Sequence, residues 1–233
     1  MKKTMTQIKE PLKEMFSRSK LLILDFSQIP SNSPVEENIK FFFEACEAHN
    51  KDPKLPVNRQ KFNDALLEKS GMRYLVSRYL EDRSAMLYGS SIYKEGRTYH
   101  LGIDIFSKDK EAVYAPCDGD ILYIGEESEN HSFGHFLIFR PNDNILPYIF
   151  FGHLSAKSHV PGLVKSGEMI GRMGDYINHE NGGWSRHLHL QLLSNLPEKG
   201  AAPKGYTSLN DLAQAKIDFP NPIKTLFPNW KIN

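Results

Sequence analysis

Two stretches of the chain, residues 100–106 and 187–193, alternate between apolar side chains and polar or small ones. Because successive side chains on a strand point to opposite faces, this alternation predicts two half-buried β-strands. The polar faces carry His100, Gly102 and Asp104 in the first strand and His187, His189 and Gln191 in the second. The apolar faces carry Leu101, Ile103, Ile105, Leu188, Leu190 and Leu192. If both strands lie in one sheet, two imidazoles and a carboxylate converge at one point of its surface.

The region from Met86 to Leu196 contains further short runs of β-branched and aromatic residues, separated by Gly, Pro, Asn and Asp. These runs predict additional strands at residues 112–115, 119–125, 135–140, 145–151 and 168–173. The segments 116–119 and 141–144 have the composition of turns between them. No helical pattern lies between the strands, so we expect a mainly β fold with a compact antiparallel sheet or sandwich.

The first part of the chain, residues 1–84, has helical patterns instead. A capping box with proline at its second position, residues 33–36, predicts a helix that ends near Asn50. A second helix is predicted from Asn58 to Gly71 and a third over residues 73–80. The proline-rich tail from residue 197 contains a short helical stretch at 209–215. We therefore divide the chain into an N-terminal helical region (1–84), a β domain (85–196) and a C-terminal extension (197–233).

Charge and composition exclude several classes of partner. The 233 residues carry a formal net charge of +1, which provides no electrostatic footprint for nucleic acid. The two cysteines, Cys46 and Cys117, form neither a disulfide framework nor a Cys-type zinc site. Neither a secretory apolar segment nor a membrane span follows the basic start of the chain. We expect a cytoplasmic protein, or a periplasmic or secreted one that is exported without an N-terminal signal.

The converging side chains have the composition of a metal site. Two histidines and one aspartate with an open fourth position are the ligand set of a catalytic zinc ion, which lowers the pKa of its bound water to about 7. Peptide hydrolysis also needs a group that transfers the proton and one that stabilises the oxyanion. Histidines outside the ligand set, including His153 at the end of an apolar strand, suit both tasks.

The order of these motifs resembles the lysostaphin and LytM-type zinc metallopeptidases, also called the β-lytic or Gly-Gly endopeptidase family (peptidase M23). The resemblance covers residues 97–194 and includes His-x-x-x-Asp, Gly-His-Leu-Ser at residues 152–155, and His-Leu-His-Leu-Gln at residues 187–191. It implies the compact β fold of that family, a duplicated hybrid motif. It also implies one zinc ion per chain, with metal ligands His100, Asp104 and His189 and catalytic residues His153 and His187.

The resemblance also implies a function and a substrate class. The expected activity is that of a zinc metalloendopeptidase that hydrolyses peptidoglycan cross-bridges or stem peptides. One subgroup, the version found between kinase-like and aminotransferase-like domains in some proteins, is more similar still, through residues 181–184, 78–83 and 219–222. Trp184 is expected to line the substrate groove or to anchor the core. The remaining histidines are interpreted as surface or packing residues: His49, His131, His135, His159 and His179.

Two other functions are compatible with the same sequence pattern. The first is a metal-binding regulatory module of the same fold that does not hydrolyse a substrate, with residues 1–84 covering the cleft. The second is a phosphocarrier similar to the glucose-specific phosphocarrier of bacterial sugar transport, in which a histidine is phosphorylated. The sequence predicts neither the scissile bond nor the oligomeric state.

Overall fold

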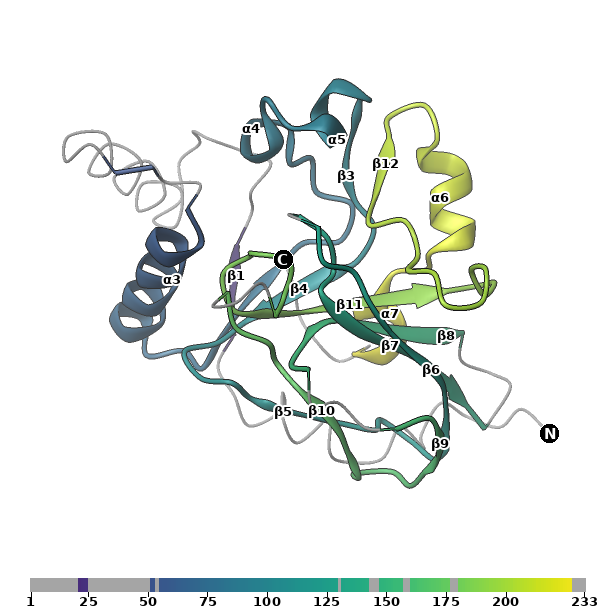
Figure 1. The fold of residues 1–233 in the computed structure, drawn as a ribbon. Helices are drawn as coiled ribbons and strands as arrows, with labels where there is room; N and C mark the ends of the chain where they lie inside the picture. The colour runs from purple at the N-terminus through teal and green to yellow at the C-terminus, as the bar shows by residue number, and fades with distance from the viewer. Residues whose placement is uncertain are drawn as a thin grey trace.

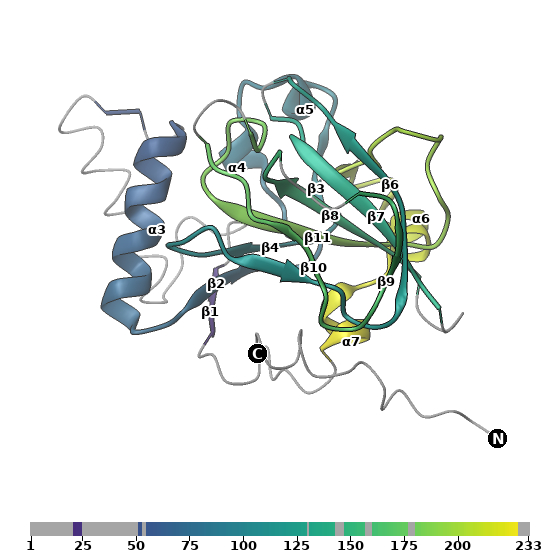
Figure 2. The ribbon, with the colours of Figure 1, turned by 60° about the horizontal axis from the view of Figure 1, so that its bottom comes forward.

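The computed structural model describes residues 21–24, 51–52, 55–129, 131–142, 147–156, 160–176 and 180–227. The helix expected over residues 33–50 lies outside these ranges, as do His49, His159 and His179. The described residues form a mainly β structure, in which a large curved sheet is flanked by short helices and two small sheets (Figures 1 and 2). The mainly β fold expected from the sequence is confirmed.

The large sheet has eight strands within the described residues. In spatial order they are β1 (Leu21–Leu24), β2 (Tyr74–Ser77), β4 (Ile103–Phe106), β11 (His187–Leu193), β8 (Tyr148–Leu154), β7 (His135–Pro141), β6 (Gly119–Glu126) and β9 (Gly162–Val164). All neighbouring pairs are antiparallel except β1 and β2, which are parallel. The two motif-bearing strands β4 and β11 are therefore direct neighbours at the centre of the sheet.

Two small sheets and five helices complete the described fold. Strand β5 (Ala112–Tyr114) pairs with β10 (Met169–Arg172), and β3 (Arg97–His100) pairs with β12 (Tyr206–Ser208). The helices are α3 (Pro56–Ser70), α4 (Ser84–Leu87), α5 (Ser91–Lys94), α6 (Leu212–Asp218) and α7 (Pro222–Leu226). Figure 2 shows α3 standing at the end of the sheet that carries β1, β2 and β4.

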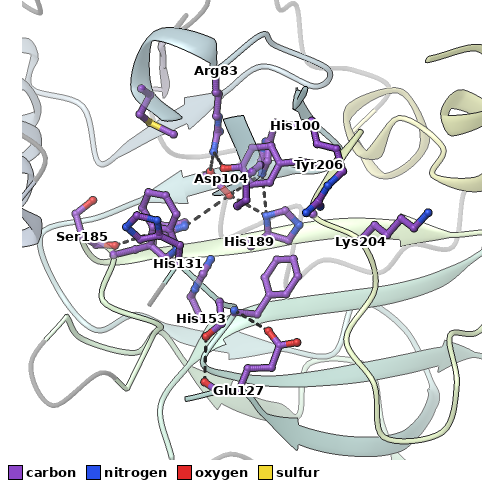
Figure 3. A pocket seen from close by; sticks show the side chains of 18 of the residues that line it. Arg83, His100, Asp104, Glu127, His131, His153, Ser185, His189, Lys204 and Tyr206 are labelled. Atoms are coloured by element: carbon purple, nitrogen blue, oxygen red, sulfur yellow. Dashed lines mark hydrogen bonds and ion pairs between the residues drawn. The ribbon is translucent and has the colours of Figure 1, made fainter. Parts of the chain in front are cut away.

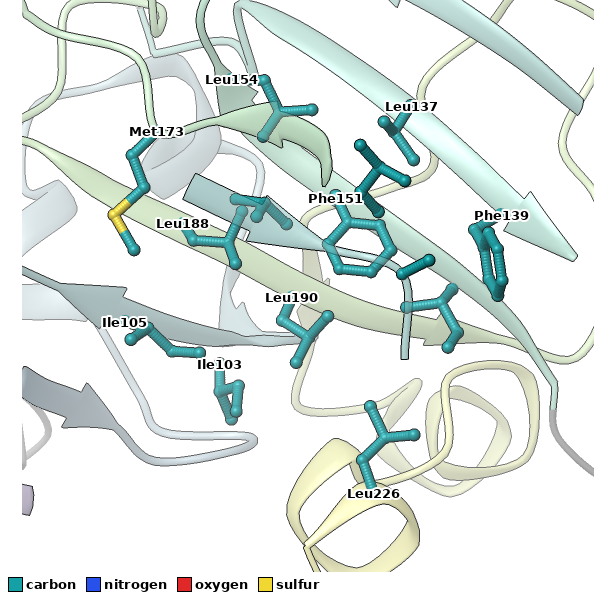
Figure 4. Packing of buried hydrophobic residues seen from close by; sticks show 14 of the residues in the cluster. Ile103, Ile105, Leu137, Phe139, Phe151, Leu154, Met173, Leu188, Leu190 and Leu226 are labelled. Carbon is teal, nitrogen blue, oxygen red and sulfur yellow. The ribbon is translucent and has the colours of Figure 1, made fainter. Parts of the chain in front are cut away.

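The main hydrophobic core lies under one face of the central strands (Figure 4). The side chains of Ile103, Ile105, Leu188 and Leu190 are completely buried in it, as the alternating pattern predicts. They pack together with side chains from β5, β10 and α7, including Val113, Ile170, Met173 and Leu226. Because the apolar positions of β4 and β11 face this core, the polar positions of both strands face the opposite side of the sheet.

Two local expectations are wrong. The strand expected over 100–106 is interrupted at residues 101–102, so that its first part belongs to β3 and its second to β4. The helix expected over 73–80 is replaced by strand β2, because residues 74–77 are buried between β1 and β4 and their backbone hydrogen bonds are made across the sheet. Residues 116–118 connect β5 to β6, as their turn composition predicts, although these two strands do not pair with each other: β5 pairs with β10, and β6 pairs with β7 and β9.

The second predicted helix is confirmed as α3, which ends at Gly71 in the left-handed conformation that suits a helix C-terminus. The short helix of the tail is α6, shifted by a few residues from the expected 209–215. The limits of the three proposed regions stay a prediction, although β2 from the first region is a member of the large sheet. Among the described residues, no helix has both the length and the apolar character needed to cross a membrane.

Candidate metal centre and active site

Three adjacent strands of the large sheet, β4, β11 and β8, bring histidines and an aspartate to one cavity (Figure 3). In the strand register, His189 of β11 lies opposite Asp104 of β4 on one side and Gly152 of β8 on the other. His153 follows Gly152 in β8, and His100 enters from the end of β3. The cavity has a volume of about 210 Å³ and its lining includes all five predicted site residues.

The three predicted metal ligands point their donor atoms at one another. His189 Nδ1 lies 3.0 Å from Asp104 Oδ1 and 3.0 Å from His100 Nε2. The remaining distance, from His100 Nε2 to Asp104 Oδ1, is 3.5 Å. All three side chains are at most 3% exposed. Ligands about 2.0–2.2 Å from a tetrahedral ion lie roughly 3.3–3.5 Å apart, so one side of this triangle matches a zinc site and the other two are slightly shorter.

The hydrogen bonds around His189 direct its Nδ1 atom into the triangle. The side-chain nitrogen of Gln191 donates to the backbone oxygen of Lys204 at 3.0 Å, which leaves its oxygen, 2.8 Å from His189 Nε2, as an acceptor. His189 Nε2 therefore carries a proton, and Nδ1 is the ring nitrogen that is placed to coordinate an ion. Nδ1 faces the carboxylate oxygen of Asp104, so a metal ion at this point would have both atoms as ligands.

Gly102 lets the backbone of residues 101–102 lie close to the His189 ring. A Cβ atom added at Gly102 would lie 2.6 Å from Cε1 and 2.7 Å from Nε2 of His189. The absence of a side chain therefore gives space to the His189 ring. The chain bends at residues 101–102, so His100 and Asp104 approach the site from two different strands.

The second oxygen of the Asp104 carboxylate is held by a buried ion pair. Arg83 Nη1 lies 2.7 Å from Asp104 Oδ2, and Arg83 Nη2 lies 2.6 Å from Glu81 Oε1. Burial by itself raises the pKa of the Asp104 carboxyl, but the nearby His100 and Arg83 outweigh it and hold this pKa well below its usual range. The Asp104 backbone N–H also donates to Ser77 Oγ at 2.7 Å. Residues before position 85 thus contribute directly to the site.

The two remaining site histidines, His153 and His187, are each anchored through Nδ1. His153 Nδ1 donates to the backbone oxygen of Asn181 at 2.8 Å, and His187 Nδ1 donates to that of Ser185 at 2.6 Å. Their ring centroids are 4.2 Å apart. Burial lowers the pKa of both imidazoles, that of His153 to well below its usual value. Both rings are therefore uncharged at neutral pH, with Nε2 available as a proton acceptor.

Trp184 lies in the cavity wall, where its ring is 4.9 Å from that of His131. The interpretation of His131 as a surface or packing residue therefore misses that it lines the cavity. His135 is placed as expected, away from the site and 3.8 Å from Glu126. The role of Trp184 in substrate binding stays a prediction.

Sequence reasoning did not identify several polar residues of the site, including Arg59, Arg83, Lys204 and Tyr206. Burial and the neighbouring Arg83 lower the pKa of Arg59 to about 10, so its guanidinium is still charged at neutral pH. Neither Arg59 nor Lys204 forms an ion pair with another described residue. Arg59, Lys204 and Tyr206 lie in segments that carry none of the recognised motifs, so no local pattern indicated their place in the cavity.

Residues 98–200 match the family model described as Peptidase family M23. The chain carries a Peptidase family M23 domain. This domain includes the metal-site triangle and both anchored histidines, and the match supports a metallopeptidase. No curated protein matches the chain.

Solved structures of peptidases are similar to part of the chain around the M23 domain. The catalytic domain of lysostaphin, an antimicrobial peptidase from Staphylococcus simulans, is 23% identical over 51% of this chain and 80% of its own, with a TM-score of 0.36. The longer lysostaphin chain is 24% identical over 50% of this chain and 45% of its own, with a TM-score of 0.36. A zinc-containing peptidase from Vibrio cholerae is 23% identical over 46% of this chain and 31% of its own, with a TM-score of 0.35. The chain thus spans less than half the length of the last two.

Proposed function

We propose that the protein is a zinc metalloendopeptidase that hydrolyses peptide bonds, with peptidoglycan cross-bridges or stem peptides as its substrates. The observation that carries this proposal is the buried triangle of His100 Nε2, Asp104 Oδ1 and His189 Nδ1, whose sides are 3.0–3.5 Å long. Two uncharged imidazoles with available Nε2 atoms stand beside the triangle. A metal site and two such bases are the groups that peptide hydrolysis requires.

His100, Asp104 and His189 are the residues that would hold the metal ion. When bound, a zinc ion polarises a carbonyl and lowers the pKa of a bound water to about 7. Gln191 fixes the His189 ring so that Nδ1 faces the site, and Arg83 takes the outer oxygen of Asp104 so that Oδ1 faces inward. The donors are thus oriented before the ion binds.

His187 and His153 are the residues that would move the proton and stabilise negative charge. His187 Nε2 lies 3.7 Å from Asp104 Oδ1, on the side of the ring that faces the triangle. Its Nδ1–H is held by the Ser185 carbonyl, so Nε2 is the atom that accepts a proton and returns it to the leaving amine. His153 stands next to it and, when protonated, can donate a hydrogen bond to the developing oxyanion.

The walls of the cavity favour a peptide that carries negative charge. Arg59 and Lys204 supply cations that form no ion pair with another described residue, whereas Arg97 is paired with Glu95 at 2.5 Å. Trp184 and His131 add an aromatic surface on which a peptide can lie. A carboxylate near the scissile bond would find a partner among these cations.

The test combines metal analysis with digestion of purified peptidoglycan and of synthetic cross-bridge and stem peptides by the full chain. The account expects one zinc ion per chain, hydrolysis that stops with a chelator and returns with zinc, and a new amino terminus at each cleavage. His189→Ala is expected to lose both metal and activity, and His187→Ala to lose activity while keeping the metal. Stoichiometric zinc without hydrolysis of any substrate would overturn the proposal and favour a metal-binding regulatory module.

A further inference from the structure

Helix α3 faces the site with polar side chains. Gln60 and Asn63 are each only 4% exposed, although they lie on a helix of the region outside the M23 domain. One turn further along, Leu66 and Leu67 pack in an apolar cluster with Phe106 of β4. A buried amide without a hydrogen-bond partner is costly. Both Gln60 and Asn63 have partners in the residues just before β11.

The Gln60 amide bridges β4 and β11 where the two strands separate. The last ladder pair of these strands is Phe106 with His187. Beyond it, Gln60 Oε1 accepts from the backbone N–H of Arg186 at 2.7 Å, and Gln60 Nε2 approaches the backbone oxygen of Ser107 at 3.4 Å. The side-chain amide thus takes the place of the next pair of backbone groups in the ladder.

The peptide group that Gln60 holds is the one that orients His187. The N–H of the Ser185–Arg186 peptide is bound by Gln60, and the carbonyl of the same peptide accepts from His187 Nδ1 at 2.6 Å. Because a peptide group is planar, a rotation that frees its N–H also turns its oxygen away from the imidazole. A hydrogen bond at one end of the group also polarises the acceptor at the other end.

The second contact of the His187 ring leads back to the same helix. Phe106 stacks on it with ring centroids 4.9 Å apart and an angle of 29° between the planes. Phe106 itself packs against Leu66 and Leu67 of α3. The metal ligands do not depend on these contacts, since His189 is oriented by Gln191 and Asp104 by Arg83.

We propose that Gln60 is a positioning residue for His187, which acts through the Ser185–Arg186 peptide. This inference rests on the proposed catalytic role of His187. It assigns α3 to the working enzyme: the helix fixes the direction in which His187 Nε2 points, and it leaves metal binding to other residues. The second buried amide of the helix, Asn63, contacts the Ser185 hydroxyl at 3.5 Å and not the peptide group.

The test compares zinc-loaded full chains that carry Gln60→Met or Asn63→Leu. Both variants remove a buried amide from the same helix, so both lower the melting temperature. Gln60→Met is expected to lower kcat about tenfold or more with KM and zinc content unchanged, because positioning partners of site residues contribute 10–100-fold. Asn63→Leu is expected to keep kcat. Equal kcat values in the two variants would overturn the inference.

A rescue variant and a spectroscopic readout separate positioning from general damage. Gln60→Glu combined with Asp64→Asn keeps an oxygen acceptor for the Arg186 N–H, and keeps the contact that Gln60 makes with Asp64 at 2.8 Å. It is expected to recover most of the kcat that Gln60→Met loses. Nitrogen NMR of the zinc-loaded chain should show His187 as the Nδ1–H form in the wild type and a mixture of both forms in Gln60→Met.

The NMR measurement also distinguishes failure of this inference from failure of the proposed function. A wild-type chain that hydrolyses nothing, but whose His187 signal changes in Gln60→Met, would refute the peptidase and leave the positioning role intact. An active wild type with the same His187 signal in both proteins would refute the positioning role alone.

Discussion

The guanidinium of Arg83 lies 2.7 Å from Oδ2 of Asp104, while Oδ1 of the same carboxylate faces the His100 and His189 imidazoles. The two oxygens of Asp104 therefore serve different partners. One completes a buried ion pair with Arg83 and Glu81, and the other is free to face a cation. Because Arg83 precedes the M23 domain in the sequence, residues from the first region complete the metal site.

Removal of Arg83 should destabilise the fold strongly. Arg83→Met leaves Glu81 and Asp104 as buried carboxylates without their counter-ion, which typically costs about 3–5 kcal/mol. Urea unfolding of the metal-free protein measures this loss. The double variant with Glu81→Gln should recover part of it, because one unpaired charge is then removed as well. If the double variant loses as much free energy of unfolding as the two single variants lose together, this coupling is contradicted.

Loss of the Gln191 side chain should weaken metal binding without unfolding the protein. Gln191→Leu removes the acceptor that holds His189 Nε2–H, so Nδ1 no longer points steadily at the site. The zinc affinity, measured by competition with a chelating indicator, should fall roughly 10–100-fold. Gln191→Glu keeps an oxygen acceptor and should bind zinc more tightly than Gln191→Leu. If all three proteins have equal affinity, Gln191 does not orient the ligand.

Charge in the cavity should determine which peptides bind well. Arg59→Gln removes a cation from the cavity wall, and Lys61→Gln removes the same charge from the exposed side of α3. For a peptide with a carboxylate near the scissile bond, KM should rise about tenfold in Arg59→Gln, because hydrogen bonds to charged groups contribute about 1.5–3 kcal/mol. The corresponding carboxamide peptide should show no such change, and Lys61→Gln should resemble the wild type with both.

Acid should remove stability that Glu180 provides. Burial by itself raises the pKa of this carboxyl, but hydrogen bonds from Ser155, Lys110 and the backbone amides of Asp175 and Ala156 outweigh it and lower the pKa to about 2. A depressed pKa stabilises the fold above the unfolded-state value of 4.5, and this contribution is lost as the pH falls from 4.5 towards 2. The free energy of unfolding should therefore fall less steeply in Glu180→Gln across this interval. If the free energy of unfolding falls equally steeply with pH in both proteins, protonation of Glu180 is not linked to folding.

The sequence was sufficient where local pattern decides the structure. Alternation over residues 187–193 determines that Leu188 and Leu190 enter the core and that His187 and His189 face the other way. The strand alternation assumed between His100 and Asp104 was wrong, yet both residues reach the site. Gly102, at the bend that replaces it, lies against the His189 ring, and no local pattern contains that contact.

Partners distant in sequence account for what could not be predicted. Strand β2 forms because β1 and β4 pair with it, and the same residues alone are compatible with a helix. Gln60 meets Arg186 across 126 positions, and an isolated glutamine in a helix gives no signal of such a contact. Arg83 similarly acquires its role only when Asp104 is placed beside it.

The most direct test of the central claim is anomalous diffraction at the zinc edge from crystals of the zinc-loaded protein. The account predicts one strong peak per chain, about 2.0–2.2 Å from His100 Nε2, Asp104 Oδ1 and His189 Nδ1, with His187 Nε2 and His153 Nε2 nearby but not bound. A zinc peak held by His187 or His153, or no peak among these side chains, would contradict it.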